Sequence, residues 1–180
     1  MERQHYFKKL IMKEFLIKIN ACQDAIDWAD GKEWKEIFET CHRGDWLLWL
    51  FNRTNPNDIQ LLTLAKGYCA NTVRHLMKDE QSILAVDAAI AFGEGKITKE
   101  QLHTAAAAAN YPADADAATT YAAAAATYAA ADVDAANAAA AAAYAADVYA
   151  ADADAKKQNQ LLTANICRKY LPIEKWNIKN

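Results

Sequence analysis

Apolar residues recur three and four positions apart through the first hundred residues, a spacing typical of amphipathic helices. Leu10, Phe15 and Leu16 begin one such stripe, with lysines at positions between them. Because the stripe continues to Ala29, the pattern predicts one long helix that ends at Gly31. A shorter helix is expected over residues 33–40.

The most apolar segment of the chain follows at residues 45–51. Tryptophan, leucine and phenylalanine there fall on every side of a helix, which predicts a central place in the core. Asn55 is a good N-cap and Pro56 suits a first helical turn. We therefore expect the next helix to begin at this pair and to run to about Met77.

Two further helices are expected before residue 110. One covers residues 82–92 and ends at Gly93. Thr98 and Gln101 have the spacing of a capping box, in which each side chain accepts a hydrogen bond from the other residue's backbone N–H. The capping box predicts that a helix begins there and reaches about Asn110.

Alanine then dominates the chain. Residues 105–155 contain 31 alanines in 51 positions, together with seven aspartates and no lysine, arginine or glutamate. Alanine is the best intrinsic helix former, but its single methyl group buries little area. Pro112 breaks the preceding helix, and no further Gly or Pro occurs up to Tyr170, so one helix or two are expected there.

These patterns predict an all-α fold, a single-domain helical bundle over residues 1–180. Residues 1–103 supply a core half rich in Trp and Leu, on which the alanine-rich, acidic helices of residues 104–156 pack. Residues 157–180 form a C-terminal helix and tail. The long alanine helices need this arrangement because their own side chains are too small to build a core.

Charge is distributed unevenly. The net charge is −3, but residues 105–155 carry −7 and the remainder of the chain carries +4. DNA-binding domains usually carry a basic stripe, so DNA is not an expected partner. The longest uncharged run of the tract, residues 117–131, has 15 residues and falls short of the ~20 that cross a membrane. Four widely spaced cysteines without a CxxC pair predict reduced thiols in a cytoplasmic protein, with no metal and no cofactor.

The alanine tract has more than one interpretation. Tyr121, Tyr128 and Tyr149 share a heptad register, which favours a close-packed helix interface with bulky side chains at intervals. If the tract is instead a binding face, its aspartates and tyrosines are the candidate contacts: Asp132, Asp134, Asp147, Tyr128 and Tyr144. An ice-binding helix needs Thr about every eleven residues, and the threonines are not spaced in that way. Ice binding and a purely structural role are therefore the weaker alternatives.

No catalytic set is visible, and the chain is not expected to be an enzyme. It lacks a Gly-rich phosphate loop, and paired aspartates such as Asp132 and Asp134 lie two residues apart, on different sides of a helix. The tryptophans around residue 46 either fill the core or line a ligand pocket. In the second interpretation the rings stack on a nucleobase and the arginines hold a phosphate, with these residues: Arg43, Trp46, Trp49 and Arg53.

Three segments resemble a known family. They are Ala21-Cys22 with Trp28, the run from Arg43 to Arg53 that contains Asp-Trp-Leu-Leu-Trp-Leu, and the alanine and tyrosine tract closed by Ile166 to Pro172. The chain is similar there to the alanine-rich helical immunity proteins of bacterial polymorphic-toxin systems and some phages. The resemblance covers roughly residues 20–172. It implies an all-helical, non-catalytic protein that neutralises its target by binding it.

Two functions follow from these observations. The first is an immunity or antagonist protein that neutralises a protein toxin or a defence effector stoichiometrically. Its partner should be basic, because the tract carries only aspartate among its charged residues. The alternative is a helical sponge that sequesters a small nucleotide-type immune signal, as in phage anti-defence. Self-association into a homo-oligomer is left open.

Overall fold

The computed structural model describes residues 12–77, 80–109 and 153–178, and every regular element in these ranges is helical. The all-α prediction is confirmed, and the described residues contain no strand. The chain divides into two compact units, residues 1–41 with 177–180 and residues 42–176. Each unit is described by itself, and the expectation of a single domain stays a prediction.

The first unit contains short helices. A helix over residues 12–18 is followed by α2 (Gln23–Ala29) and α3 (Trp34–Thr40). The prediction of one continuous helix from the first stripe to Gly31 is wrong, because the chain turns at Asn20, whose φ is 60°. Asparagine adopts this left-handed conformation more readily than other residues with a Cβ. The predicted stop at Gly31 is correct, and there too φ is positive, at 76°.

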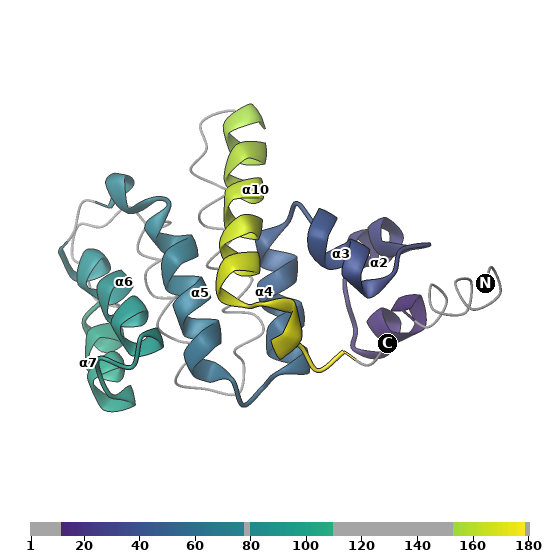
Figure 1. The fold of residues 1–180 in the computed structure, drawn as a ribbon. Helices are drawn as coiled ribbons and strands as arrows, with labels where there is room; N and C mark the ends of the chain where they lie inside the picture. Colours follow the sequence, from purple (N-terminus) through teal and green to yellow (C-terminus); the bar gives the residue numbers. More distant parts are fainter. Residues whose placement is uncertain (1–11, 78–79, 110–152, 179–180) are drawn as a thin grey trace. The chain divides into compact units, whose positions relative to one another are not determined.

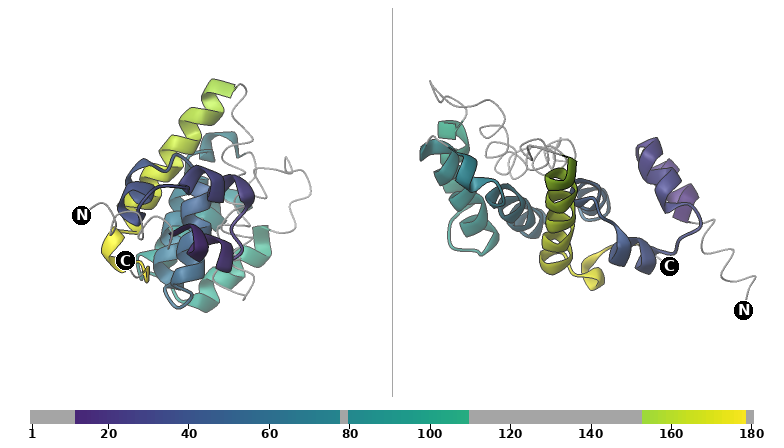
Figure 2. Two further views of the ribbon diagram at one scale, coloured as in Figure 1. Left: turned by 90° about the vertical axis from the view of Figure 1, so that its right-hand side faces the viewer. Right: turned by 90° about the horizontal axis from the view of Figure 1, so that it is seen from above.

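The second unit contains α4 (Gly44–Thr54), α5 (Ile59–Asn71), α6 (Glu80–Gly93), α7 (Lys99–Ala109) and α10 (Ala153–Tyr170). α10 packs against both α4 and α5, although more than eighty residues separate it from them in sequence. α6 packs on α5, and α7 packs on α6, away from α4 (Figures 1 and 2). The segment between α7 and α10, including most of the alanine tract, lies outside the described residues.

Glycine permits the closest helix contacts in this unit. A Cβ atom built on Gly44 would lie 2.5 Å from Thr163 Oγ1 and 2.7 Å from the Thr163 backbone carbon, so α4 and α10 meet there with no room for a side chain. Gly67 plays the same part between α5 and α6, where its added Cβ would lie 2.9 Å from Ile90. Helices that approach this closely gain contacts between backbones as well as between side chains.

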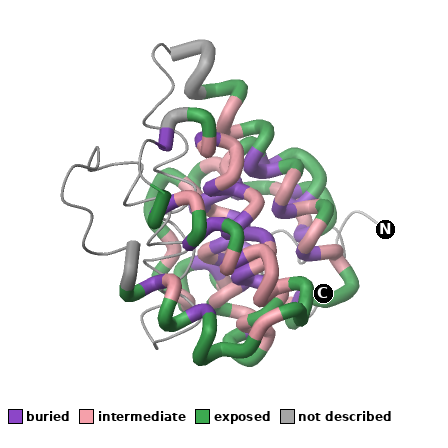
Figure 3. Tube along the Cα trace, turned by 90° about the vertical axis from the view of Figure 1, so that its left-hand side faces the viewer, coloured by how far each residue is buried: buried purple, intermediate pink, exposed green. Residues whose placement is uncertain are grey.

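The apolar core of the second unit extends from α5 through α6 to α7. Buried positions recur along the helices with half-buried and exposed positions between them (Figure 3). The buried cluster contains Ala70, Val73, Met77, Ala85, Val86, Ala89 and Leu102. Small residues on α6 allow this packing, as a helix rich in alanine and glycine can approach its neighbours closely.

The predicted bounds of the helix from Pro56 to about Met77 are wrong in detail. α5 begins at Ile59 rather than at Pro56, and it ends at Asn71, before the short 3-10 helix η1 (Arg74–Leu76). Asn55 is the C-cap of α4 instead of an N-cap. Its buried side chain donates a hydrogen bond of 2.5 Å to the backbone oxygen of Lys175, a contact that the local sequence does not indicate.

Other local predictions are confirmed. The capping box opens α7, with Thr98 N donating to Gln101 Oε1 at 2.8 Å and Gln101 N donating to Thr98 Oγ1 at 3.3 Å. The C-terminal helix is present as α10, and the 3-10 helix η2 (Ile173–Lys175) follows it. Trp176, which follows η2, packs edge-on against Phe51 of α4 at 5.0 Å between ring centroids.

Candidate functional site

Helix α4 has two unlike sides. Trp46, Trp49 and Arg53 follow one another at spacings of three and four residues, so they form one stripe along the helix. The two tryptophans are half-buried and Arg53 is exposed. With the N-cap residue Arg43 this stripe is named the α4 face. The other side of α4 is fully buried, through Leu47, Leu48 and Phe51.

The predicted place of this segment in the core is confirmed for its leucines and Phe51, but Trp46 and Trp49 are only half-buried. A helix that packs on its neighbours buries only the side turned toward them. Leucine and phenylalanine occupy that side of α4, which leaves both tryptophans at its margin. The residues of the predicted ligand pocket are nevertheless brought together, because all of them belong to this one helix and its cap.

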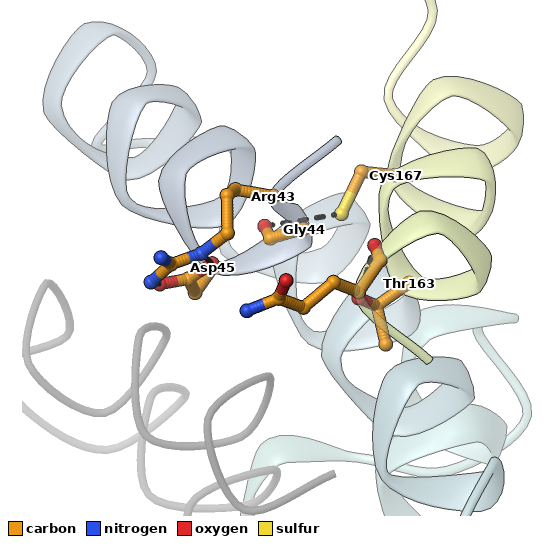
Figure 4. Close-up of polar contacts among 6 residues, drawn as sticks. Arg43, Gly44, Asp45, Thr163 and Cys167 are labelled. Atoms are coloured by element: carbon orange, nitrogen blue, oxygen red, sulfur yellow. Dashed lines mark hydrogen bonds and ion pairs between the residues drawn. The ribbon is translucent and has the colours of Figure 1, made fainter. Parts of the chain in front are cut away.

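An ion pair holds the first turn of α4. Arg43 Nε donates to Asp45 Oδ1 at 2.8 Å, and Arg43 Nη2 donates to Asp45 Oδ2 at 2.5 Å (Figure 4). This bidentate geometry is the strong form of an Arg–carboxylate contact. Asp45 is buried, with 7% of its surface exposed, and it also lies in the first helical turn, where the helix dipole favours a negative charge.

Contacts from α10 fix the same turn from its other side. The Cys167 thiol donates to the Gly44 carbonyl oxygen at 3.5 Å, and Thr163 lies directly against Gly44 (Figure 4). Burial raises the pKa of the Cys167 thiol well above its ordinary value, so the group stays protonated and remains a donor. The start of the α4 face is thus anchored on a rigid helix pair.

Two cation–ring pairs make up the α4 face. The guanidinium carbon of Arg43 lies 4.8 Å from the centroid of the Trp46 ring, and that of Arg53 lies 5.7 Å from the Trp49 ring. His42 adds a third ring, tilted against Trp46 at 6.1 Å between centroids. A guanidinium over an indole is an attractive electrostatic contact, and it also restrains both side chains.

The chemistry of this face suits binding by stacking and apolar contact. Tryptophan and arginine are the residues most enriched among those that dominate protein interfaces. The face is less suited to binding a phosphate, because the Arg43 guanidinium already donates two hydrogen bonds to Asp45. Arg53 is the residue of the face whose charge is turned to solvent.

The second set of predicted site residues falls elsewhere. Its members lie outside the described residues, so the prediction that they bind a partner is neither confirmed nor contradicted: Asp132, Asp134, Asp147, Tyr128 and Tyr144.

Sequence reasoning missed His42 and Asp45 as members of the site. His42 precedes the N-cap of α4, so helical spacing does not predict the contact of its ring with Trp46. Asp45 follows Arg43 by two residues, a separation at which side chains on a continuous helix do not face each other. The pair forms because Arg43 is the N-cap, with a φ of −113° and a ψ of 104°, and so precedes the helix.

No cluster of three or more His, Cys, Asp or Glu side chains in the described ranges has the geometry to hold a metal ion. None of the described helices is long and apolar enough to cross a membrane. None of the four cysteines forms a disulfide; Cys22 is exposed and the other three are buried.

Comparison with known proteins adds no relative: no family model, no curated protein and no solved structure matches the chain. The resemblance to alanine-rich immunity proteins therefore stays a prediction.

Proposed function

We propose that the protein is a non-catalytic antagonist that neutralises a protein toxin or a defence effector by stoichiometric binding. The α4 face is the binding surface that the geometry favours. The observation that carries the proposal is the pair of half-buried tryptophans, Trp46 and Trp49, each covered by an arginine on one rigid helix.

Rigidity supports this assignment. Binding costs the conformational freedom of every side chain that becomes ordered, so residues that are ordered beforehand bind more tightly. Arg43 is restrained by Asp45 and Trp46, and the helix below it is fixed through Gly44 by α10. The Arg43 end of the stripe is therefore restrained before any partner binds.

The acidic tract supplies the complementary part of the proposal. We expect Asp132, Asp134 and Asp147 to attract a basic partner and to accelerate its association. Changing all three to Asn should reduce protection without unfolding the protein. Affinity for the partner should also fall as the salt concentration rises, since salt screens exposed charges.

A second candidate is a sponge for a nucleotide-type signal, and the Trp49–Arg53 pair is the feature that favours it. An indole offers a stacking surface for a base, and an exposed guanidinium can bind a phosphate. The pairing of Arg43 with Asp45 argues against it, because that guanidinium would have to leave a buried carboxylate.

The test compares two matched pairs of residues. Trp28 and Lys32 on the first unit repeat the spacing of Trp49 and Arg53, with the Lys32 ammonium 4.4 Å from the Trp28 ring centroid. The full chain, its Trp49→Ala/Arg53→Ala variant and its Trp28→Ala/Lys32→Ala variant serve as crosslinking baits in a bacterial lysate. Each recovered protein is then purified and titrated calorimetrically against all three.

The proposal predicts a fixed binding ratio and a loss of affinity of at least about thirtyfold in the α4 variant, as for a hot spot of about 2 kcal/mol or more. The Trp28→Ala/Lys32→Ala variant should bind like the parent. Release of an intact nucleotide-type molecule from the heat-denatured parent, but not from the α4 variant, would select the sponge. Recovery of a chemically altered target at substoichiometric protein would show an enzyme and refute both.

A further inference from the structure

A lysine lies inside the second unit, on the buried side of α5. Lys66 has no exposed surface, and its neighbours one turn before and after it on the same side, Leu62 and Ala70, are buried as well. A lysine almost never takes such a position without a partner for its charge. Its place in an otherwise apolar stripe was visible in the sequence.

Thr63 lies beside it, three residues earlier and therefore on the same side of the helix. This side chain is also fully buried. Within the described parts of the chain, neither Lys66 Nζ nor Thr63 Oγ1 has a hydrogen-bond partner. As far as the described residues go, both buried groups therefore lack a hydrogen bond, which destabilises the fold unless something else satisfies them.

The flanking positions of α5 are engaged in helix packing. Gly67 lies against Ile90 and Ala89 of α6, and the Cys69 thiol donates weakly to the Thr163 carbonyl oxygen of α10, at 3.8 Å. Burial lowers the pKa of Lys66 to about 7, while nearby Cys69 acts in the opposite direction. A bound anion would restore the ammonium form, because an opposite charge favours the charged state.

We propose that Thr63 and Lys66 bind the carboxylate of a small organic acid that has an apolar tail. One carboxylate oxygen accepts a hydrogen bond from the Lys66 ammonium and the other accepts one from the Thr63 hydroxyl, which satisfies both side chains and cancels the charge. The inference goes beyond the antagonist function, since it concerns the interior of α5 and not the α4 face.

The number and charge of the donors select this class of ligand. A single ammonium balances one negative charge, whereas a phosphate dianion would bring a second charge into the interior without a partner. The ligand's tail should be apolar because the positions around the pair on α5 are Leu62, Ala65 and Ala70, all of them buried. Butyrate should therefore bind more tightly than acetate.

The experiment follows the melting temperature of the full chain at pH 6.5 as butyrate is added. Acetate, inorganic phosphate and sodium chloride are added at the same ionic strength for comparison. The protein is first denatured in urea and refolded to remove acids carried from the cell. Butyrate should raise the melting temperature saturably by several degrees, because a ligand that binds only the folded state stabilises it.

Three variants test the residues. Lys66→Met should melt at a higher temperature than the parent without ligand and should show no response to butyrate. Thr63→Val keeps the shape of the side chain but loses the hydroxyl, so the apparent Kd for butyrate should rise about tenfold. Lys157→Met removes an exposed lysine of α10 and should respond like the parent.

The ammonium of Lys66 offers a second readout, since its NMR signal should shift on addition of butyrate to the parent and to Lys157→Met. Equal responses of Lys66→Met and the parent to butyrate would overturn the proposal. So would a refolded parent that responds to butyrate no more than to sodium chloride. Stabilisation by phosphate but not by butyrate would refute the carboxylate assignment.

Discussion

Helices α4 and α5 of the second unit distribute their polar groups in opposite ways. On α4 the side turned to the core is apolar apart from the paired Asp45, and the cations lie on the outer stripe with the tryptophans. On α5 the core side contains Thr63 and Lys66, neither of which has a hydrogen-bond partner in the described residues. The candidate binding residues of α4 thus lie outside the core, and those of α5 lie inside it.

The difference determines how substitutions on each helix change the free energy of unfolding. Trp49 and Arg53 on the α4 face can change with little loss of packing, because Leu48 and its buried neighbours hold the helix. The buried polar groups of α5 oppose folding, so their removal should stabilise the protein. A residue that lowers stability and yet occupies a core position is more readily explained by function than by folding.

The largest expected effect is at Lys66. Its pKa is about 7 in the folded protein against 10.5 ordinarily, and this difference corresponds to about 5 kcal/mol. Between pH 7 and 10.5 the unfolded chain holds a proton that the folded chain lacks, so stability rises with pH across this window. Below about pH 7 both states are protonated and the full cost remains.

Lys66→Met should therefore be more stable than the parent at pH 7, by up to about 5 kcal/mol, and the gain should narrow as the pH rises toward 10.5. Urea denaturation of both proteins at several pH values, without added acids, measures the difference. A parent that is more stable than Lys66→Met at pH 7 would contradict the unpaired state of this lysine.

Leu48 should show the next largest effect, in the opposite direction. Its side chain is fully buried on the core side of α4. Leu48→Ala should lower the free energy of unfolding by about 2–5 kcal/mol, through lost burial and the cavity that remains. A loss below about 1 kcal/mol in urea denaturation would mean that the buried side of α4 is assigned wrongly.

Gly44 tests the contact between α4 and α10. Helix propensity alone predicts that Gly→Ala stabilises a helix by about 1 kcal/mol. The contact with Thr163 predicts instead a loss of about 1–3 kcal/mol, because the added methyl overlaps both the side chain and the backbone. Thr163→Ala in the same chain should restore only part of the loss, as the backbone carbon stays in place.

The smallest effect on stability should be at Trp49. Its ring is half-buried, so Trp49→Ala should cost about 1 kcal/mol, well below the cost of Leu48→Ala. Its effect on partner binding should be far greater than its effect on stability. Melting curves and calorimetric titrations of the same preparations provide both values. A stability loss equal to that of Leu48→Ala would show that Trp49 belongs to the core.

Local sequence signals predicted several elements well. The helix class, the short α3, the capping box at Thr98 and the stop at Gly31 all depend on residues that are close together in the chain. The failures occurred where one local signal has two meanings. Asn20 is compatible with a helix but instead adopts a left-handed turn conformation. Asn55 is compatible with an N-cap but instead donates a hydrogen bond to the backbone of Lys175.

What the sequence by itself determined is the helical class, most helix positions and the grouping of Arg43, Trp46, Trp49 and Arg53, since these follow from spacing along one chain segment. The tertiary structure alone decided which side of α4 is buried, which residue meets Gly44, and that Lys66 has no exposed surface. The physical reason is that burial depends on contacts between segments far apart in sequence. Helical periodicity defines the sides of a helix, but only its neighbours determine which side is turned inward.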